Sequence, residues 1–71
     1  MNTVEILARL PKEVQEAAKE YKSVFSMNCR MREYTKAMDK KTEINGYCKA
    51  LQDMGLVNKE ERQRISSYLT L

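Results

Sequence analysis

The sequence predicts an all-α fold, and two observations support this prediction. Only two glycines and one proline occur in the 71 residues, and strong helix formers fill most other positions. Apolar residues recur at alternating spacings of three and four, as they do on one face of an α-helix. The length limits the chain to one helical domain, residues 1–71.

A short helix is expected before Pro11. Thr3 is a suitable cap for it, and Val4, Leu7 and Leu10 follow at helical spacing. The residue before a proline is pushed out of the helical region, so this segment should end near Leu10. Pro11 then suits the first turn of the next helix, where its missing N–H is not needed.

Residues 12–54 are predicted to form one long helix, with a kink or a break near Asn45-Gly46 as the alternative. Neither glycine nor proline occurs between Lys12 and Asn45, and an apolar a/d stripe extends over nearly four heptads. Gly46 costs only about 1 kcal/mol relative to alanine in a helix interior. That cost is too small to end a helix that packs on both sides.

A last helix, residues 59–69, is expected to pack back on the long helix as a hairpin. Gly55 suits the left-handed position that follows a helix end. Asn58 and Glu61 have the spacing of a capping box at the start of the last helix. The predicted residues of the hairpin turn are Leu51, Gly55, Val57, Asn58 and Glu61.

Residues 48–71 resemble the short C-terminal helical hairpin of bacterial and phage proteins, the SHOCT motif. In that pattern a leucine lies four residues before a glycine. A β-branched residue, a helix cap and a glutamate follow the glycine by two, three and six residues, and the five turn residues match these places. Arg62 departs from the pattern, where the motif usually has an aromatic residue. The resemblance implies an assembly or interaction role in a small accessory protein of a bacterium or mobile element.

The residue types argue against an enzyme or a metalloprotein. The chain has no histidine, and its two cysteines, Cys29 and Cys48, are far apart in the sequence. A nucleophile needs a base beside it and a structural zinc site needs four ligands, so we expect no catalysis, cofactor or metal. No apolar run is long enough to span a membrane. The charged N-terminal segment with Pro11 does not fit a signal peptide, which favours a cytoplasmic location with reduced thiols.

The leading hypothesis is a noncatalytic interaction module that self-associates as a homodimer or larger helical bundle, or binds another protein. A long helix with two short ones would leave part of its apolar stripe in water, at a considerable cost in forgone burial. The charge pattern of a parallel coiled coil is missing, which favours antiparallel packing. Asn28 either sets the register of a dimer or lies partly exposed at the edge of the stripe, and we prefer the second interpretation. The predicted self-association residues are Val14, Tyr21, Val24, Phe25, Asn28, Met31 and Met38.

Two other functions remain open. Thirteen basic and ten acidic residues give a net charge of +3, which permits a small nucleic-acid-binding regulator without requiring one. The basic helical face of such a regulator would comprise Arg30, Arg32, Lys36, Lys59, Arg62 and Gln63. The other alternative is a protein inhibitor encoded on a phage or mobile element, which the sequence does not separate from an interaction module.

Overall fold

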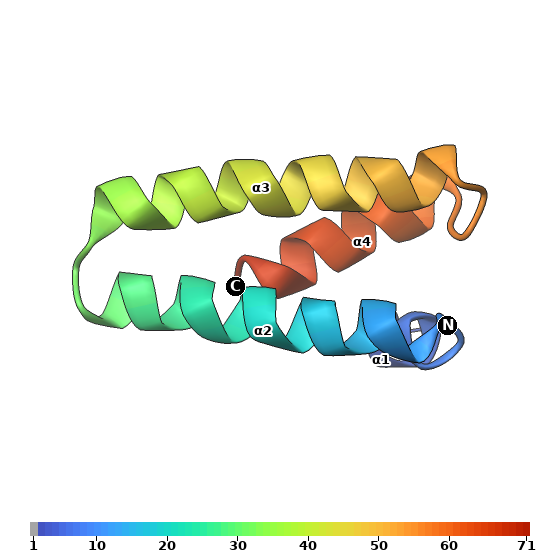
Figure 1. Cartoon of the computed structure of the whole chain (residues 1–71), viewed down its shortest axis with the longest axis horizontal. Coiled ribbons are helices and arrows are strands. Elements are labelled where there is room, and N and C mark those ends of the chain that lie inside the picture. The colour runs from blue at the N-terminus through green and yellow to red at the C-terminus, as the bar shows by residue number, and fades with distance from the viewer. Residues whose placement is uncertain (1) are drawn as a thin grey trace.

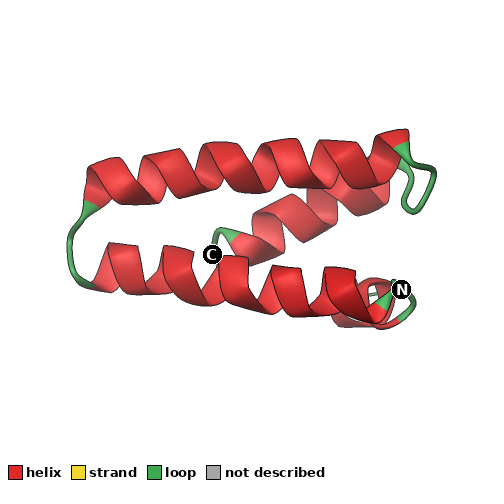
Figure 2. Ribbon diagram, in the orientation of Figure 1, coloured by secondary structure: helices red, strands yellow, loops and turns green. Residues whose placement is uncertain are grey.

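The computed structural model describes residues 2–71. In this range it contains four helices and no strand: α1 (Thr3–Ala8), α2 (Lys12–Arg30), α3 (Tyr34–Asp53) and α4 (Lys59–Leu69). Helices α2 and α3 form a long antiparallel hairpin, α4 folds back along it, and α1 lies beside the N-terminal end of α2 (Figure 1). Short loops join the helices (Figure 2). The predicted all-α class, with short helices at both ends of the chain, is confirmed.

The helical span 12–54 is interrupted at a place other than the one that the sequence suggested. Helix α2 ends at Arg30 and helix α3 begins at Tyr34, so the span forms two antiparallel helices instead of one. Helix α3 passes through Asn45-Gly46 without a break. A Cβ atom built on Gly46 would meet no other heavy atom within 4 Å. No other element therefore packs so close to this position that it requires a glycine.

The turn between α2 and α3 is a Schellman motif. The amide of Glu33 donates to the carbonyl of Asn28 at 2.8 Å, and the amide of Arg32 donates to the carbonyl of Cys29 at 3.1 Å. Arg32 adopts a left-handed conformation with a φ of 58°, in the position that glycine usually occupies in this motif. Because the turn contains neither glycine nor proline, the sequence pattern did not reveal it.

Tertiary burial explains why the chain turns at Arg32. The turn lets α3 fold back on α2, so that Ile44 of α3 and Val14 and Phe25 of α2 become buried in one core. Each such side chain contributes roughly 1.5–3 kcal/mol on burial. A left-handed residue with a Cβ costs about 1–2 kcal/mol, so the burial of several apolar side chains outweighs the strain.

A single core extends through the molecule and receives side chains from all four helices. Its buried members are Ile6, Leu10, Val14, Ala18, Phe25, Ala37, Ile44, Cys48, Leu51, Val57, Ile65 and Leu69. The expectation that a second copy is needed to cover the apolar stripe is therefore wrong for Val14 and Phe25, because the chain itself buries them. Asn28 is buried as well, and not at the exposed edge of the stripe where we expected it.

The C-terminal hairpin has the predicted turn and cap. Gly55 has a positive φ of 78°, while Leu51 and Val57 are buried on either side of it. The amide of Glu61 donates to Oδ1 of Asn58 at 2.8 Å, and the amide of Asn58 donates to Oε1 of Glu61 at 2.9 Å. These two bonds form the capping box that starts α4.

The N-terminal helix differs from the prediction in its cap and in its length. The cap is Asn2, whose Oδ1 accepts the amide of Glu5 at 2.9 Å, and Thr3 is the first helical residue. Helix α1 ends at Ala8, and Pro11 lies at the N-cap of α2 instead of inside its first turn. None of the helices in residues 2–71 has the length and hydropathy needed to cross a membrane.

Candidate binding surfaces

The residues of the predicted nucleic-acid face do not lie on one surface. Three of them lie in or beside the turn between α2 and α3 and three in the first turns of α4, at opposite ends of a molecule about 34 Å long (Figure 1). The first group is Arg30, Arg32 and Lys36, and the second is Lys59, Arg62 and Gln63. A single stretch of nucleic acid along one helix would therefore contact only one group.

The start of α4 is also acidic. Glu60 pairs with Arg64 at 3.0 Å, and Glu61 pairs at 2.6 Å with Arg9, the residue that follows α1. The amide of Asn58 and the guanidinium of Arg9 hold the pKa of the Glu61 carboxyl below its ordinary value. A phosphate approaching this helix end would meet two carboxylates.

Arg62 is only half exposed, so it does not present its whole guanidinium to a nucleic acid. Its Nε is buried, and within residues 2–71 it has no hydrogen-bond partner. Arg62 lies close enough to Cys48 of α3 to oppose the rise in that thiol's pKa. The position where the SHOCT pattern has an aromatic residue thus packs toward α3 in this chain.

The two cysteines differ in their surroundings. Cys48 is buried in the core, and burial raises the pKa of its thiol to about 11. Cys29 is exposed on α2. Residues 2–71 contain no group of three or more histidine, cysteine or carboxylate side chains that could hold a metal ion.

Exposed apolar side chains are concentrated near the turn between α2 and α3. Eight large apolar side chains of residues 2–71 are exposed, and four of these lie between residues 27 and 38. Those four are Met27, Met31, Tyr34 and Met38. Methionine and tyrosine are residues that often form adaptable contacts with partner proteins.

Tyr34 and Met38 lie on the side of the hairpin against which α4 packs. Asn45 marks this side of α3, because its side chain accepts a hydrogen bond from Ser66 of α4. Tyr34, Met38 and Lys41 precede Asn45 by 11, 7 and 4 residues, so they lie on the same side of the helix.

The matching side of α2 is identified by Lys22, whose Nζ donates to the carbonyl of Tyr68 in α4 at 2.9 Å. Ser26 and the pair Cys29-Arg30 follow Lys22 at helical spacing. Helix α4 ends near the middle of the hairpin, so nothing in residues 2–71 continues its layer toward the turn (Figure 1). We call this uncovered area the open face, and it comprises Ser26, Cys29, Arg30, Tyr34, Met38 and Lys41.

Met27 and Met31 belong to the opposite side of the hairpin. They continue the line of Val24 at helical spacing, and Val24 borders a groove between α2 and α3. In this groove the rings of Tyr21 and Tyr47 lie 5.3 Å apart. The predicted self-association residues are thus divided: Val14, Phe25 and Asn28 are buried, Tyr21, Val24 and Met31 lie on the groove side, and Met38 lies on the open face.

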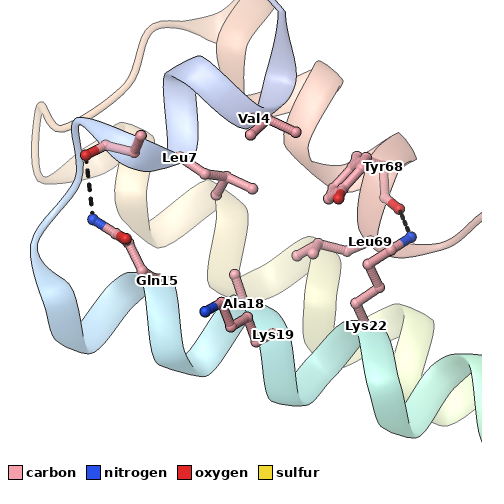
Figure 3. A pocket seen from close by; sticks show the side chains of 9 residues that line it. Val4, Leu7, Gln15, Ala18, Lys19, Lys22, Tyr68 and Leu69 are labelled. Carbon is pink, nitrogen blue, oxygen red and sulfur yellow. Dashed lines mark hydrogen bonds between the residues drawn. The ribbon is translucent and has the colours of Figure 1, made fainter.

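A pocket of about 200 Å³ lies between α1, α2 and α4 (Figure 3). Three contacts hold the short helix α1 and the residues that follow it over the pocket. Nε2 of Gln15 donates to the carbonyls of Ala8 at 3.2 Å and of Leu10 at 2.8 Å, and Arg9 pairs with Glu61. Its apolar lining consists of Val4, Leu7, Ala8, Ala18, Tyr68 and Leu69.

The charged residues of this pocket are both basic. They are Lys19 and Lys22 of α2, and among residues 2–71 no carboxylate contributes to the lining. The ammonium of Lys22 is engaged with Tyr68, since it binds the backbone carbonyl and lies 4.3 Å from the ring centroid. Lys19 forms no ion pair within residues 2–71. The sequence pattern marks Val4 only as an apolar residue of the first helix and does not indicate Lys19, because only the tertiary packing of α1 on α2 brings the two into one pocket.

No family model, no curated protein and no solved structure matches this chain. The resemblance of residues 48–71 to the SHOCT motif therefore stays a prediction. The function has to be inferred from the open face of the hairpin and from the pocket beneath α1.

Proposed function

We propose that this protein is a noncatalytic interaction module whose open face binds an acidic amphipathic helix of another protein. The observation that carries the proposal is the exposure of Tyr34 and Met38, 63% and 66%, on the side of the hairpin that a third helix covers elsewhere. Both side chains lie next to the layer of α4. A partner helix that continued this layer would remove them from water.

The dimensions favour a short helical partner. Helix α3 has 20 residues and α4 has 11, which correspond to lengths of about 30 Å and 16 Å at about 1.5 Å per residue. About 14 Å of the hairpin therefore lies beyond α4, enough for two to three turns of a helix. Recognition of this kind places an apolar stripe of the guest helix on the apolar part of a host surface.

The charges favour an acidic partner over a second copy of the chain. Residues 30–41 contain five basic and two acidic side chains, which equals the whole net charge of +3. On the open face the charged residues are Arg30 and Lys41. A second copy docked through this face would bring like charges together, whereas glutamates beside the apolar stripe of a guest helix would complement them.

The proposal is tested with a synthetic amphipathic peptide that carries leucines on one face and glutamates on the other. With methyl-labelled methionine, nuclear magnetic resonance should show the Met38 signal shifting on addition of the peptide, while those of Met27 and Met31 stay in place. In the parent protein the peptide should also shift the backbone amide signals around the open face. Replacing Tyr34 and Met38 together by alanine should abolish these amide shifts. The matched control replaces Met27 and Met31 by alanine, at the same end of the hairpin but on its other side.

Three outcomes would contradict the proposal. The first is a peptide-dependent shift of Met31 without one of Met38, which would place the binding surface on the groove side. The second is equal binding of a peptide with lysines in place of the glutamates. The third is a concentration-dependent dimer, detected by sedimentation equilibrium, that dissociates when Tyr34 and Met38 are both replaced by alanine. That result would show that a second copy of the chain occupies the open face, and it would support self-association.

A DNA duplex serves as the test of the nucleic-acid alternative. If phosphate contacts dominated, the duplex would bind the turn residues Arg30 and Arg32, and its affinity would fall steeply with salt. Binding of the acidic peptide depends on burial of Tyr34 and Met38 as well, so it should weaken less. A steep salt dependence with a stronger affinity for the duplex would favour the regulator over the interaction module.

A further inference from the structure

The pocket beneath α1 is separate from the open face and has the features of a small-molecule site. Its lining comes from α1, from residues 15–22 of α2 and from the end of α4 (Figure 3), whereas the open face begins at Ser26 of α2. Its volume of about 200 Å³ exceeds that of an apolar protein cavity of about 150 Å³ that holds benzene. The pocket therefore accommodates a short hydrocarbon group, but not a long lipid chain.

The chemistry of the lining limits the class of ligand. Leu7, Ala18 and Leu69 supply apolar surface, which favours a hydrocarbon group over a sugar or a nucleotide. Lys19 and Lys22 are the charged residues that line the pocket. Because Lys22 already binds Tyr68, Lys19 is the cation left to meet a ligand anion.

We propose that this pocket binds a small aliphatic carboxylate, with its hydrocarbon part between α1 and α4 and its carboxylate beside the ammonium of Lys19. Apolar burial supplies most of the affinity, and the exposed lysine supplies preference for an anion. A ligand held there contacts α1, α2 and α4 together. The ligand binds only while α1, the shortest of the four helices, is docked on α2 and α4. Binding therefore also stabilises the docked state of α1.

The experiment is a titration of the full chain with hexanoate, followed by amide chemical shifts. Saturable shifts are expected in α1, around Ala18 and at the end of α4, with a dissociation constant in the millimolar range. Lys19→Met keeps the apolar stem and should weaken binding roughly three- to fivefold, the effect of losing one exposed ion pair. Lys12→Met is the matched control on the same helix outside the pocket, and it should leave the affinity unchanged.

A second variant tests the cavity itself. Ala8 lines the pocket and is exposed at the end of α1, so Ala8→Leu should fill the space and abolish hexanoate binding without lowering the melting temperature. Hexylamine, with the same hydrocarbon chain and the opposite charge, should bind more weakly than hexanoate.

The proposal is overturned by absence of saturable shifts, by equal binding of hexylamine, or by an unchanged affinity of Lys19→Met. Shifts confined to Tyr34 and Met38 would also overturn it, because they would place hexanoate on the open face as a mimic of the acidic helix. The pocket and the open face thus give distinguishable results, and failure of one leaves the other standing.

Discussion

Arg32 and Gly55 occupy the same position of the same structural motif. Each is the left-handed residue of a Schellman turn, with φ of 58° and 78°, after α2 and α3 respectively. Glycine adopts this conformation without steric cost, whereas a residue with a Cβ is strained by about 1–2 kcal/mol. The strained turn is the one beside the open face, which places an exposed arginine where glycine would be more stable.

Replacing Arg32 with glycine should therefore stabilise the protein. We expect the free energy of unfolding to rise by about 1 kcal/mol, which corresponds to an increase of about 4–8 °C in the melting temperature of a domain of this size. Thermal unfolding followed by circular dichroism measures the melting temperature. Gly55→Ala is the control at the equivalent position and should shift the melting temperature in the opposite direction. A loss of stability in Arg32→Gly would mean that the arginine side chain contributes more than its backbone costs.

Gly46 offers a second stabilising substitution, for a different reason. It lies inside α3 with a helical conformation, and an added Cβ would meet no atom within 4 Å. Gly46→Ala should raise the free energy of unfolding by about 1 kcal/mol, because alanine loses less conformational entropy in a helix. Urea denaturation would measure the change as a higher midpoint concentration with an unchanged m-value. A destabilised Gly46→Ala variant would contradict the continuous helix through this residue.

Glu61 should make stability depend on pH. Its pKa in the folded protein is lowered from an ordinary value near 4.5, first by the Asn58 amide and then by Arg9. The ionised carboxylate therefore stabilises the fold above the unfolded pKa, and this contribution is lost as the pH falls through the lowered folded pKa.

Glu61→Gln should consequently be less stable than the parent chain near neutral pH. The difference should shrink as the pH falls below the lowered pKa, where the parent carboxyl is protonated as well. Urea denaturation across this pH range gives the comparison, with Glu60→Gln as the control from the same turn. A stability difference that stays constant down to the lowest pH would argue that the cap acts without the charge of Glu61.

The two thiols should react at very different rates. Cys29 is exposed, whereas Cys48 is buried with its pKa raised to about 11 by burial. Because the thiolate is the reactive form, a disulfide reagent at mildly alkaline pH should modify Cys29 at once and Cys48 only when the core opens. The Cys29→Ser variant should lose the fast phase of the reaction and keep only the slow phase, which belongs to Cys48. Two fast thiols in the parent chain would indicate that α3 and α4 separate readily in solution.

The local features of this fold were predictable because short-range interactions determine them. The left-handed turn at Gly55 and the capping box of Asn58 with Glu61 depend on residues within one helical turn of each other. The continuous helix through Gly46 follows from the same reasoning, since one glycine costs about 1 kcal/mol. The resemblance of the last third of the chain to a helical hairpin predicted the same local arrangement.

The turn at Arg32 was decided by tertiary structure alone. Locally, the residues around it favour helix, and their pattern predicts that α2 and α3 continue as one. The turn forms because it brings Ile44 against a core shared with Phe25, 19 positions earlier in the sequence, and burial outweighs the local strain. That choice covers Val14 and Phe25, and it leaves Tyr34 and Met38 beyond the end of α4. The sequence by itself thus determined the helices and their capped ends, while long-range burial decided where the chain reverses and which apolar residues face a partner.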